Sequence, residues 1–149
     1  MYDIVFPNHK EWQKDLESLV ANWKYTVLYF YPKDNTPWCS IQAEEFSELI
    51  EEFNKKSVEV YWVSKDGIES HKKFIDKKWI KFPLISDPNF ELHKKFWAYW
   101  EKTMFWKKYN WTIRSVIIVN EKLEIIESFI NIKAKWSWQK TLDFINTLL

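Results

Sequence analysis

The chain has 149 residues, a formal net charge of +1 and an isoelectric point near 7.7. This length suits one domain with a buried core, and we expect residues 1–149 to form a single domain. The balanced charge gives no general attraction to nucleic acid or to an anionic membrane, and no apolar run is as long as a membrane span.

In chain order, the sequence predicts alternating strands and helices. The apolar run Val27–Tyr31, stopped by Pro32, is typical of a central strand, and an apolar stripe over residues 41–53 predicts a helix that begins near Ser40. The further predicted elements are a strand at 58–64, a helix at 68–78, a short strand at 82–88, a short helix at 90–96, two strands at 113–119 and 123–132, and a helix at 138–149. This order predicts an α/β fold of the thioredoxin-like type, with a mixed central β-sheet flanked by helices. The early crossovers should be parallel, and the last two strands should form an antiparallel hairpin.

The tryptophan and glycine contents are unusual. The chain has eleven tryptophans and one glycine, Gly67, although average usage predicts roughly ten glycines. Tryptophan follows asparagine in Asn22-Trp23 and Asn110-Trp111, where Asn-Gly is the common turn dipeptide. Lys, Ile and Asn abound while Arg and Ala are scarce, which is the bias of an A+T-rich genome.

We therefore hypothesise that most of these tryptophans are UGA codons that the source organism reads as glycine. Such residues should lie in turns, be exposed or have positive φ. The alternative is a truly tryptophan-rich domain with aromatic surfaces that bind sugar or nucleic acid. The basic and aromatic segment at residues 102–109 would suit a single-stranded nucleic acid.

Cys39 is the candidate for chemistry, because it follows a predicted strand and lies in the first turn of a predicted helix. Free N–H groups and the helix dipole stabilise a thiolate there and lower the thiol pKa. Ligands also bind at the carboxyl edge of open α/β sheets. A lone cysteine is equally often a small buried apolar residue, so its position alone leaves both interpretations open.

The residues around Cys39 favour the chemical interpretation. Pro32, Thr36 and Cys39 form P-x-x-x-T-x-x-C within YFYPKDNTPWCSIQA, residues 29–43. This segment closely resembles peroxiredoxins of the bacterioferritin-comigratory or peroxiredoxin Q type, in the AhpC/TSA-like thioredoxin-fold family, which carry YFYPKDNTPGCTxQA. The resemblance continues through residues 63–66, 82–87, 96–102 and 113–115. Nine tryptophans coincide with glycine positions of that family: Trp23, Trp38, Trp62, Trp79, Trp97, Trp100, Trp106, Trp111 and Trp136. Trp12 and Trp138 have less certain counterparts.

The resemblance implies an enzyme, a hydroperoxide reductase of the thioredoxin-dependent type that acts on hydrogen peroxide and organic hydroperoxides. Cys39 would be the peroxidatic nucleophile and would pass through a sulfenic acid. Thr36 would orient the peroxide, and Pro32 would shield the thiolate. Arg114 would lower the thiol pKa and stabilise developing negative charge.

Two further positions would support these residues. Gln42, one helical turn after Cys39, would hold the Arg114 side chain. Residue 38, printed as Trp38 but glycine in the family, would act through its backbone N–H.

One departure from the family concerns the second cysteine. Many relatives carry a resolving cysteine five residues after the first, where this chain has Glu44, and no other cysteine is present. An external thiol must therefore reduce the sulfenic acid, unless two Cys39 residues link. Thioredoxin, glutaredoxin or a low-molecular-weight thiol could serve, and the resemblance favours a monomer.

The remaining expectations concern location and ligands. The N-terminus lacks a basic segment followed by an apolar one, so we expect no secretory signal. A single cysteine suits a reducing compartment, so we expect a soluble cytoplasmic protein without cofactor, membrane or nucleic-acid partner. His9, His71 and His93 are scattered, so we expect surface histidines and no metal site.

The alternative function is a non-enzymatic thioredoxin-fold redox sensor or binding module that uses Cys39. Catalytic turnover with peroxide would distinguish the enzyme from the sensor.

Overall fold

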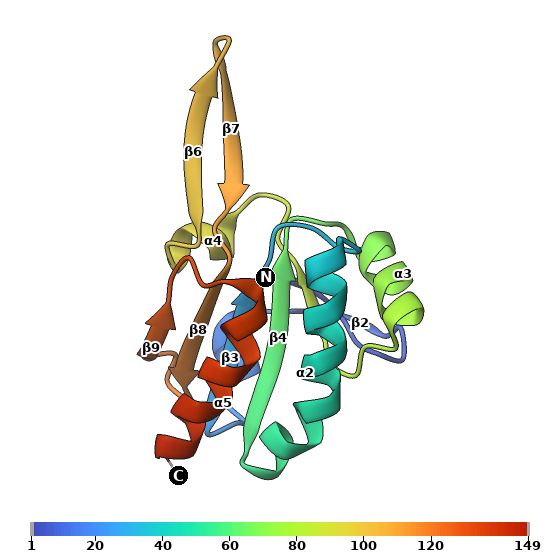
Figure 1. The fold of residues 1–149 in the computed structure, drawn as a ribbon, viewed down its shortest axis with the longest axis vertical. Helices are drawn as coiled ribbons and strands as arrows, with labels where there is room; N and C mark the ends of the chain where they lie inside the picture. Colours follow the sequence, from blue (N-terminus) through green and yellow to red (C-terminus); the bar gives the residue numbers. More distant parts are fainter. Residues whose placement is uncertain (1, 149) are drawn as a thin grey trace.

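The computed structural model describes residues 2–148, except for the side chains of Trp38, Cys39 and Trp136. Its centre is a seven-stranded mixed sheet in the order β2-β1-β5-β4-β3-β8-β9 (Figure 1). The strands are β1 (Tyr2–Val5), β2 (Glu11–Lys14), β3 (Tyr25–Phe30), β4 (Val58–Ser64), β5 (Leu84–Ser86), β8 (Ser115–Asn120) and β9 (Ile125–Phe129). β3, β4 and β5 run parallel, whereas β8 is antiparallel to both β3 and β9.

Helices cover both faces of the sheet. The helices are α1 (Leu16–Val20), α2 (Pro37–Lys55), α3 (Ile68–Lys78), α4 (Glu91–Lys95) and α5 (Ser137–Leu148), with a 3-10 turn η1 (Ala134–Trp136) before α5. Phe46 of α2, Phe74 of α3 and Ile145 of α5 pack on one face of the sheet, and Leu19 of α1 and Leu92 of α4 pack on the other. Because side chains alternate along a strand, β3 supplies apolar residues to both layers, which confirms its predicted place at the centre.

The predicted fold class and topology are confirmed. The bounds of β4 and α3 match the predicted ones, since each apolar pattern ends at a clear turn signal. α2 begins at Pro37, earlier than predicted. Proline is well suited to the first position of a helix, where its missing N–H costs nothing. No described helix is long and apolar enough to cross a lipid bilayer.

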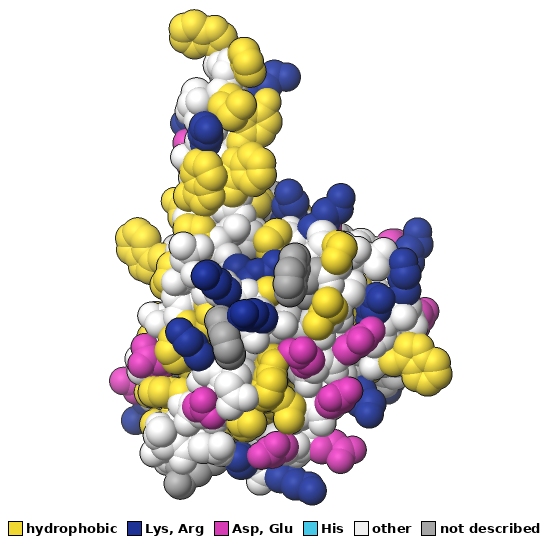
Figure 2. Space-filling view, viewed as in Figure 1, with side chains coloured by type: hydrophobic (Ala, Val, Ile, Leu, Met, Phe, Trp, Pro, Cys, Tyr) yellow, Lys and Arg dark blue, Asp and Glu magenta, His cyan; other side chains and the backbone are white. Residues whose placement is uncertain are grey.

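Two hairpins were not predicted. β1 and β2 form one at the start of the chain. β6 (Tyr99–Met104) and β7 (Lys107–Thr112) form a second, two-stranded sheet that projects from the body (Figure 1). The second hairpin carries the basic and aromatic segment, and apolar side chains gather along it (Figure 2). β2, β6 and β7 are exposed strands, so they lack the buried apolar pattern from which strands are predicted. β1 has only four residues, of which Ile4 and Val5 are buried, and this segment is too short to show the pattern.

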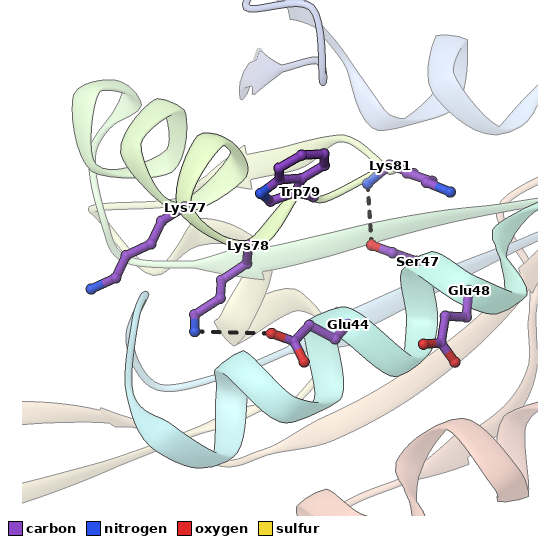
Figure 3. A pocket seen from close by; sticks show the side chains of 7 residues that line it. All are labelled: Glu44, Ser47, Glu48, Lys77, Lys78, Trp79 and Lys81. Atoms are coloured by element: carbon purple, nitrogen blue, oxygen red, sulfur yellow. Dashed lines mark hydrogen bonds and ion pairs between the residues drawn. The ribbon is translucent and has the colours of Figure 1, made fainter.

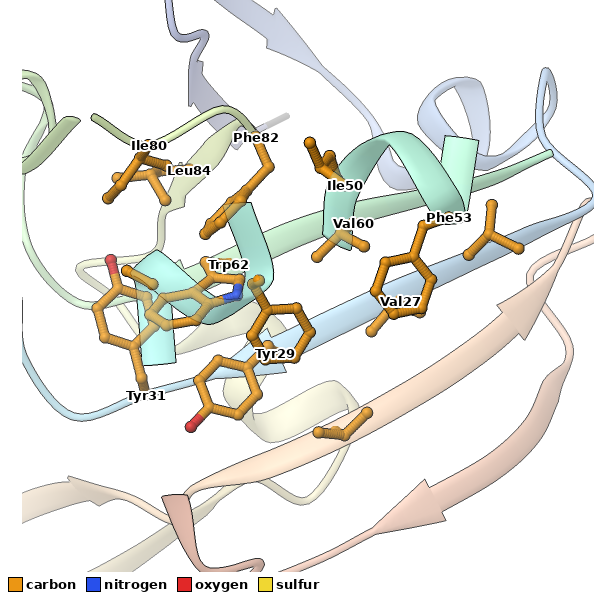
Figure 4. Packing of buried hydrophobic residues seen from close by; sticks show 14 of the residues in the cluster. Val27, Tyr29, Tyr31, Ile50, Phe53, Val60, Trp62, Ile80, Phe82 and Leu84 are labelled. Carbon is orange, nitrogen blue, oxygen red and sulfur yellow. The ribbon is translucent and has the colours of Figure 1, made fainter. Parts of the chain in front are cut away.

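Most of the tryptophans whose side chains are described lie where the recoding hypothesis predicts, although Trp23 and Trp138 are partly buried. Six are exposed at the surface: Trp12, Trp79, Trp97, Trp100, Trp106 and Trp111. Three of these have positive φ, namely Trp79, Trp97 and Trp106. Trp62 differs, because it is fully buried among aromatic rings of the core (Figure 4). Its Nε1 has no hydrogen-bond partner among the described residues.

Candidate active site

The candidate site lies at the carboxyl edge of the parallel strands. The segment that follows β3 turns through Pro32 and Asp34 to Thr36, the N-cap of α2. Cys39 is the third residue of α2, so its backbone lies in the first helical turn, as predicted. Its side chain lies outside the described residues. The start of this 19-residue helix has free backbone N–H groups and a positive dipole end, which in general lower the pKa of a thiol in the first turn.

Thr36 has its hydroxyl available for a ligand. Its backbone is extended, and its side chain makes no capping hydrogen bond among the described contacts. The first turn is closed instead by the backbone, with Ser40 N–H donating to the Thr36 carbonyl at 2.9 Å. Pro32 is partly buried beside the fully buried Tyr31. The Thr36 side chain is therefore not needed to cap α2.

Arg114 lies at the same edge of the sheet. Ser115, the first residue of β8, pairs with Phe30, the last residue of β3. Arg114 therefore lies beside the segment that leaves β3, just before the strand on which we predicted it. Its Nη1 donates to the Tyr29 hydroxyl at 2.7 Å. Its guanidinium lies 6.0 Å from the Tyr29 ring centroid.

Sequence reasoning missed Tyr29. The residue appeared only as part of the apolar run of a central strand, and nothing in that run distinguishes a ring that packs from a hydroxyl that binds. The one available signal was its place near the end of the strand that leads to Cys39.

The structure gives Gln42 a different partner from the predicted one. Gln42 is buried, and its Oε1 accepts a hydrogen bond from the Ser137 hydroxyl at 2.8 Å. Ser137 is the first residue of α5, so this bond ties the second turn of α2 to the start of the last helix. Gln42 therefore ties α2 to α5 through its side-chain oxygen, and its contact with Arg114 stays a prediction.

Glu44 occupies an exposed position on α2. Its carboxylate lies 3.9 Å from the ammonium of Lys78, in a surface hollow between α2 and the end of α3 (Figure 3). The position that holds a second cysteine in many relatives is thus a charged surface site in this chain.

A second hollow of about 490 Å³ lies beside Arg114. Its other described lining residues come from the segment between β9 and α5: Asn131, Ile132, Lys133, Ala134 and Lys135. None of these residues is acidic, so the hollow is electropositive and suits an anion.

The expectation that all three histidines are surface residues is wrong for two of them. His71 and His93 are fully buried, and each bonds a buried aspartate. Only His9 is exposed, where it pairs with Asp76 at 2.7 Å. The scattered positions in the sequence therefore gave no sign of two buried, hydrogen-bonded His–Asp pairs. Among the residues that the structure describes, no group of three or more His, Cys, Asp or Glu could hold a metal ion.

Comparisons with known proteins agree on one family. The model described as the AhpC/TSA family matches residues 1–128. A Bcp peroxiredoxin of Helicobacter pylori J99 is 40% identical over 120 residues, which cover 80% of this chain and 79% of the relative. The Bcp peroxiredoxin of Bacillus subtilis is 35% identical over 112 residues, which cover 75% and 71%.

The solved structures agree with the sequence comparisons. A structure of Xanthomonas campestris peroxiredoxin Q matches with a TM-score of 0.86 at 26% identity, covering 99% of this chain and 90% of that one. A structure concerned with alkyl peroxide reduction by the bacterioferritin comigratory protein of the same organism gives a TM-score of 0.85 at 25% identity, covering 98% and 89%. Cys39 lies at the start of α2, and Arg114 lies at the same edge of the sheet. This chain therefore belongs to the AhpC/TSA family and resembles its Bcp and peroxiredoxin Q members.

Proposed function

We propose that this peroxiredoxin reduces hydrogen peroxide and organic hydroperoxides by a one-Cys mechanism centred on Cys39. The observation that carries the proposal is the convergence of two features at one sheet edge. The only cysteine lies in the first turn of α2, and the only arginine lies just before β8, level with the segment that leaves β3.

The first step is an in-line displacement at the peroxide. The Cys39 thiolate attacks the terminal oxygen, so an S–O bond forms while the O–O bond breaks. The departing oxygen takes a proton and leaves as water or an alcohol, and Cys39 becomes a sulfenic acid. Thiolate sulfur is oxidised and the peroxide is reduced by the same two electrons.

The neighbouring residues assist this displacement. Arg114 carries a permanent charge, which stabilises both the thiolate and the negative charge that develops on the peroxide. The Thr36 hydroxyl, free of a capping bond, can donate to and accept from the peroxide. Pro32 shields the thiolate from water, and the backbone N–H of residue 38 provides a further donor. Gln42 acts indirectly, by fixing α2 against α5.

The second step needs an external thiol, because the chain has no second cysteine. A thiolate attacks the sulfenic sulfur, water leaves, and a mixed disulfide forms. A second thiol then releases Cys39. The electropositive hollow beside Arg114 suits a small thiol that carries carboxylates, and a glutaredoxin or thioredoxin would meet the same exposed edge. We also propose that the enzyme is cytoplasmic and monomeric.

Catalytic turnover tests this proposal. Purified protein should consume many equivalents of hydrogen peroxide in excess dithiothreitol, and Cys39→Ser should abolish this turnover. A matched control is His9→Asn, which removes an exposed ion pair on the body of the protein and should leave turnover unchanged. Consumption of one equivalent with every thiol offered would favour a redox sensor and refute the enzyme.

The reductant can be identified in the same assay. Turnover with a dicarboxylate thiol should exceed turnover with an uncharged thiol of similar pKa, and Lys133→Ala should remove the difference. Equal rates for the two thiols would argue for a protein reductant.

A further inference from the structure

His71 lies in a setting that neither family resemblance nor sequence pattern indicated. It belongs to α3, its side chain is fully buried, and both ring nitrogens have acceptors. Nδ1 lies 2.8 Å from Asp34 Oδ2, and Nε2 lies 3.1 Å from the carbonyl oxygen of Ile85. A carbonyl oxygen can only accept, and an ionised carboxylate can only accept. Nε2 therefore donates to the Ile85 carbonyl, and Nδ1 is hydrogen-bonded to the Asp34 carboxyl group, so His71 links α3 to both Asp34 and β5.

Asp34 is the centre of a wider set of bonds. Its carboxylate also accepts from the hydroxyls of Tyr31 and Ser70. Burial and the Asp34 charge raise the pKa of Tyr31 well above its ordinary value, so the tyrosine remains a donor. The carboxylate thus receives donors from the end of β3 and from two residues of α3. Such a fully bonded buried network defines one position for the residues that it joins.

The backbone of the same residue is fixed as well. The Asp34 N–H donates to Asp66 Oδ2 at 2.7 Å. Asp66 is itself held by the Ser64 hydroxyl at 3.0 Å, at the end of β4. Asp34 is therefore bound through both its side chain and its main chain. It lies midway between Pro32 and Thr36, in the short segment that joins β3 to α2.

We propose that Asp34 and His71 are positioning residues of the peroxidase site. They fix the 32–36 segment against α3 and β5, and thereby place the Pro32 ring and the Thr36 hydroxyl relative to the start of α2. This proposal rests on the proposed function only in the roles of those two residues. A displacement of about 1 Å at a reacting site can cost about a hundredfold in rate, so the network should affect the peroxide step strongly.

The test compares two reactions of the same thiolate. Reaction with hydrogen peroxide needs an oriented substrate, whereas alkylation by iodoacetamide needs only an accessible thiolate. Both rate constants are measured at their high-pH limits, where differences in thiol pKa do not enter. The variants are Asp34→Asn, His71→Gln and the double variant. Val58→Ala, at the opposite end of β4 in the core, is the matched control for lost stability.

We expect each of the three variants to slow the peroxide reaction by about tenfold to a hundredfold while alkylation changes less than about twofold. The double variant should lose no more than the worse single variant, because both residues act through one bond. Val58→Ala should alter neither rate. A loss shared equally by both reactions, or an unchanged peroxide rate, would overturn the proposal. Ser70→Ala removes one donor to Asp34 and repeats the test if the larger changes prevent folding. Thr36→Val separates the proposed role of Thr36 from the positioning role of Asp34 and His71. An unchanged peroxide rate in that variant would refute the Thr36 role itself.

The backbone conformation of three tryptophans bears on whether the natural protein carries tryptophan at these positions. Trp79 ends α3 in the left-handed conformation, with φ of 55°. Its N–H donates to the Ile75 carbonyl, and the Ile80 N–H donates to the same oxygen at 3.1 Å. The bond from Ile80 is the 6→1 bond of a Schellman motif, whose left-handed residue is usually glycine. The indole itself projects at the surface (Figure 3).

Trp97 repeats this arrangement at the end of α4. Its φ is 62°, and the N–H of Ala98, the next residue, donates to the His93 carbonyl at 2.8 Å. Two helices of this chain therefore end in the same motif with tryptophan at the glycine position. A side chain with a Cβ costs roughly 1–2 kcal/mol in this conformation.

Trp106 lies in the two-residue turn between β6 and β7. Met104 pairs with Lys107, and the two residues between them, Phe105 and Trp106, have φ of 50° and 66°. Positive φ at both central residues is the signature of a type I′ turn, whose second central residue is usually glycine. The Trp106 side chain is 99% exposed, so no packing offsets the conformational cost.

We infer that the natural polypeptide carries glycine at residues 79, 97 and 106, and that the other tryptophans arise from the same reassigned codon. Three separate backbone motifs that favour glycine have tryptophan at the glycine position. The one glycine of the sequence, Gly67, has φ of −80°, a conformation that any residue can adopt. Reassignment of all eleven would give twelve glycines, close to the roughly ten that average usage predicts.

Mass spectrometry of the protein isolated from its own cells tests this inference. Tandem spectra of the peptides that contain residues 79, 97 and 106 should show glycine at each position, and the intact mass should fall short of the printed chain by the matching indole groups. Tryptophan at any of the three positions would overturn the inference for the set. The same spectra read residue 38 directly, and so give the residue that adjoins Cys39.

Discussion

Replacing the three tryptophans that have a left-handed backbone conformation with glycine should stabilise the protein. Trp79, Trp97 and Trp106 are 83%, 75% and 99% exposed, so their removal forfeits little buried area. Relief of the left-handed conformation contributes about 1–2 kcal/mol at each site, and the greater freedom of glycine in the unfolded chain offsets about 0.4–1 kcal/mol of this. The net gain is about 0.7 kcal/mol per site. The sites lie in α3, α4 and the β6–β7 turn, so the gains should add to about 2 kcal/mol.

Urea unfolding and calorimetry measure this gain. For a chain of this length, about 2 kcal/mol corresponds to a rise in Tm of roughly 4–8 °C. Trp12→Gly is the matched control, because Trp12 lies in β2 without positive φ, stacks edge-on against Phe6 at 4.8 Å and meets the Lys14 ammonium at 4.6 Å. That variant should lose about 1 kcal/mol. A triple variant that is less stable than the printed chain would refute the argument from backbone conformation.

Two further predictions concern charge. Arg114→Met should raise the Cys39 thiol pKa by about one unit or more and slow the reaction with peroxide, as followed by alkylation against pH; an unchanged thiol pKa would remove the guanidinium from the mechanism. Burial raises the pKa of Glu59 from 4.5 to about 7. The folded state therefore binds the extra proton, and its stability, complete below pH 4.5, falls as the pH rises through 7. At about 1.4 kcal/mol per unit this loss is about 3 kcal/mol, and Glu59→Gln should remove most of it in urea unfolding at pH 5 and pH 8. Equal pH dependence in the two proteins would contradict the assignment.

The sequence predicted the buried strands and the helices that cover them better than the exposed hairpins. Buried strands such as β4 and an amphipathic helix such as α3 carry their apolar pattern within a few residues, so local reading suffices. The projecting β6–β7 hairpin has no such pattern, because its strands contact mainly each other and solvent. Its register depends on the two-residue turn at Phe105 and Trp106, which lacks the glycine that usually marks such a turn in a sequence.

The candidate site divides in the same way. The place of Cys39 follows from a local rule, since a strand followed by a helix puts the helix N-terminus at the sheet edge. Arg114 required the family resemblance, and its Tyr29 partner required the three-dimensional structure, because the two residues are 85 positions apart in sequence. His71 was misassigned for a related reason. A buried polar side chain is stable only with its hydrogen-bond partner, and the partner Asp34 lies 37 residues away.

A second buried pair should control the other half of the site. His93 Nδ1 lies 2.6 Å from Asp87 Oδ2, and its Nε2 lies 2.9 Å from the hydroxyl of Thr112, two residues before Arg114. Loss of this bond should therefore let the Arg114 segment shift, whereas loss of the Asp34 pair shifts the Thr36 segment. We expect His93→Gln to raise the thiol pKa of Cys39 in the direction of Arg114→Met, and the Asp34→Asn/His71→Gln double variant to leave that pKa in place. Alkylation rates measured against pH in the two variants distinguish these outcomes. Equal thiol pKa values in both would show that the buried pairs do not act on separate halves of the site.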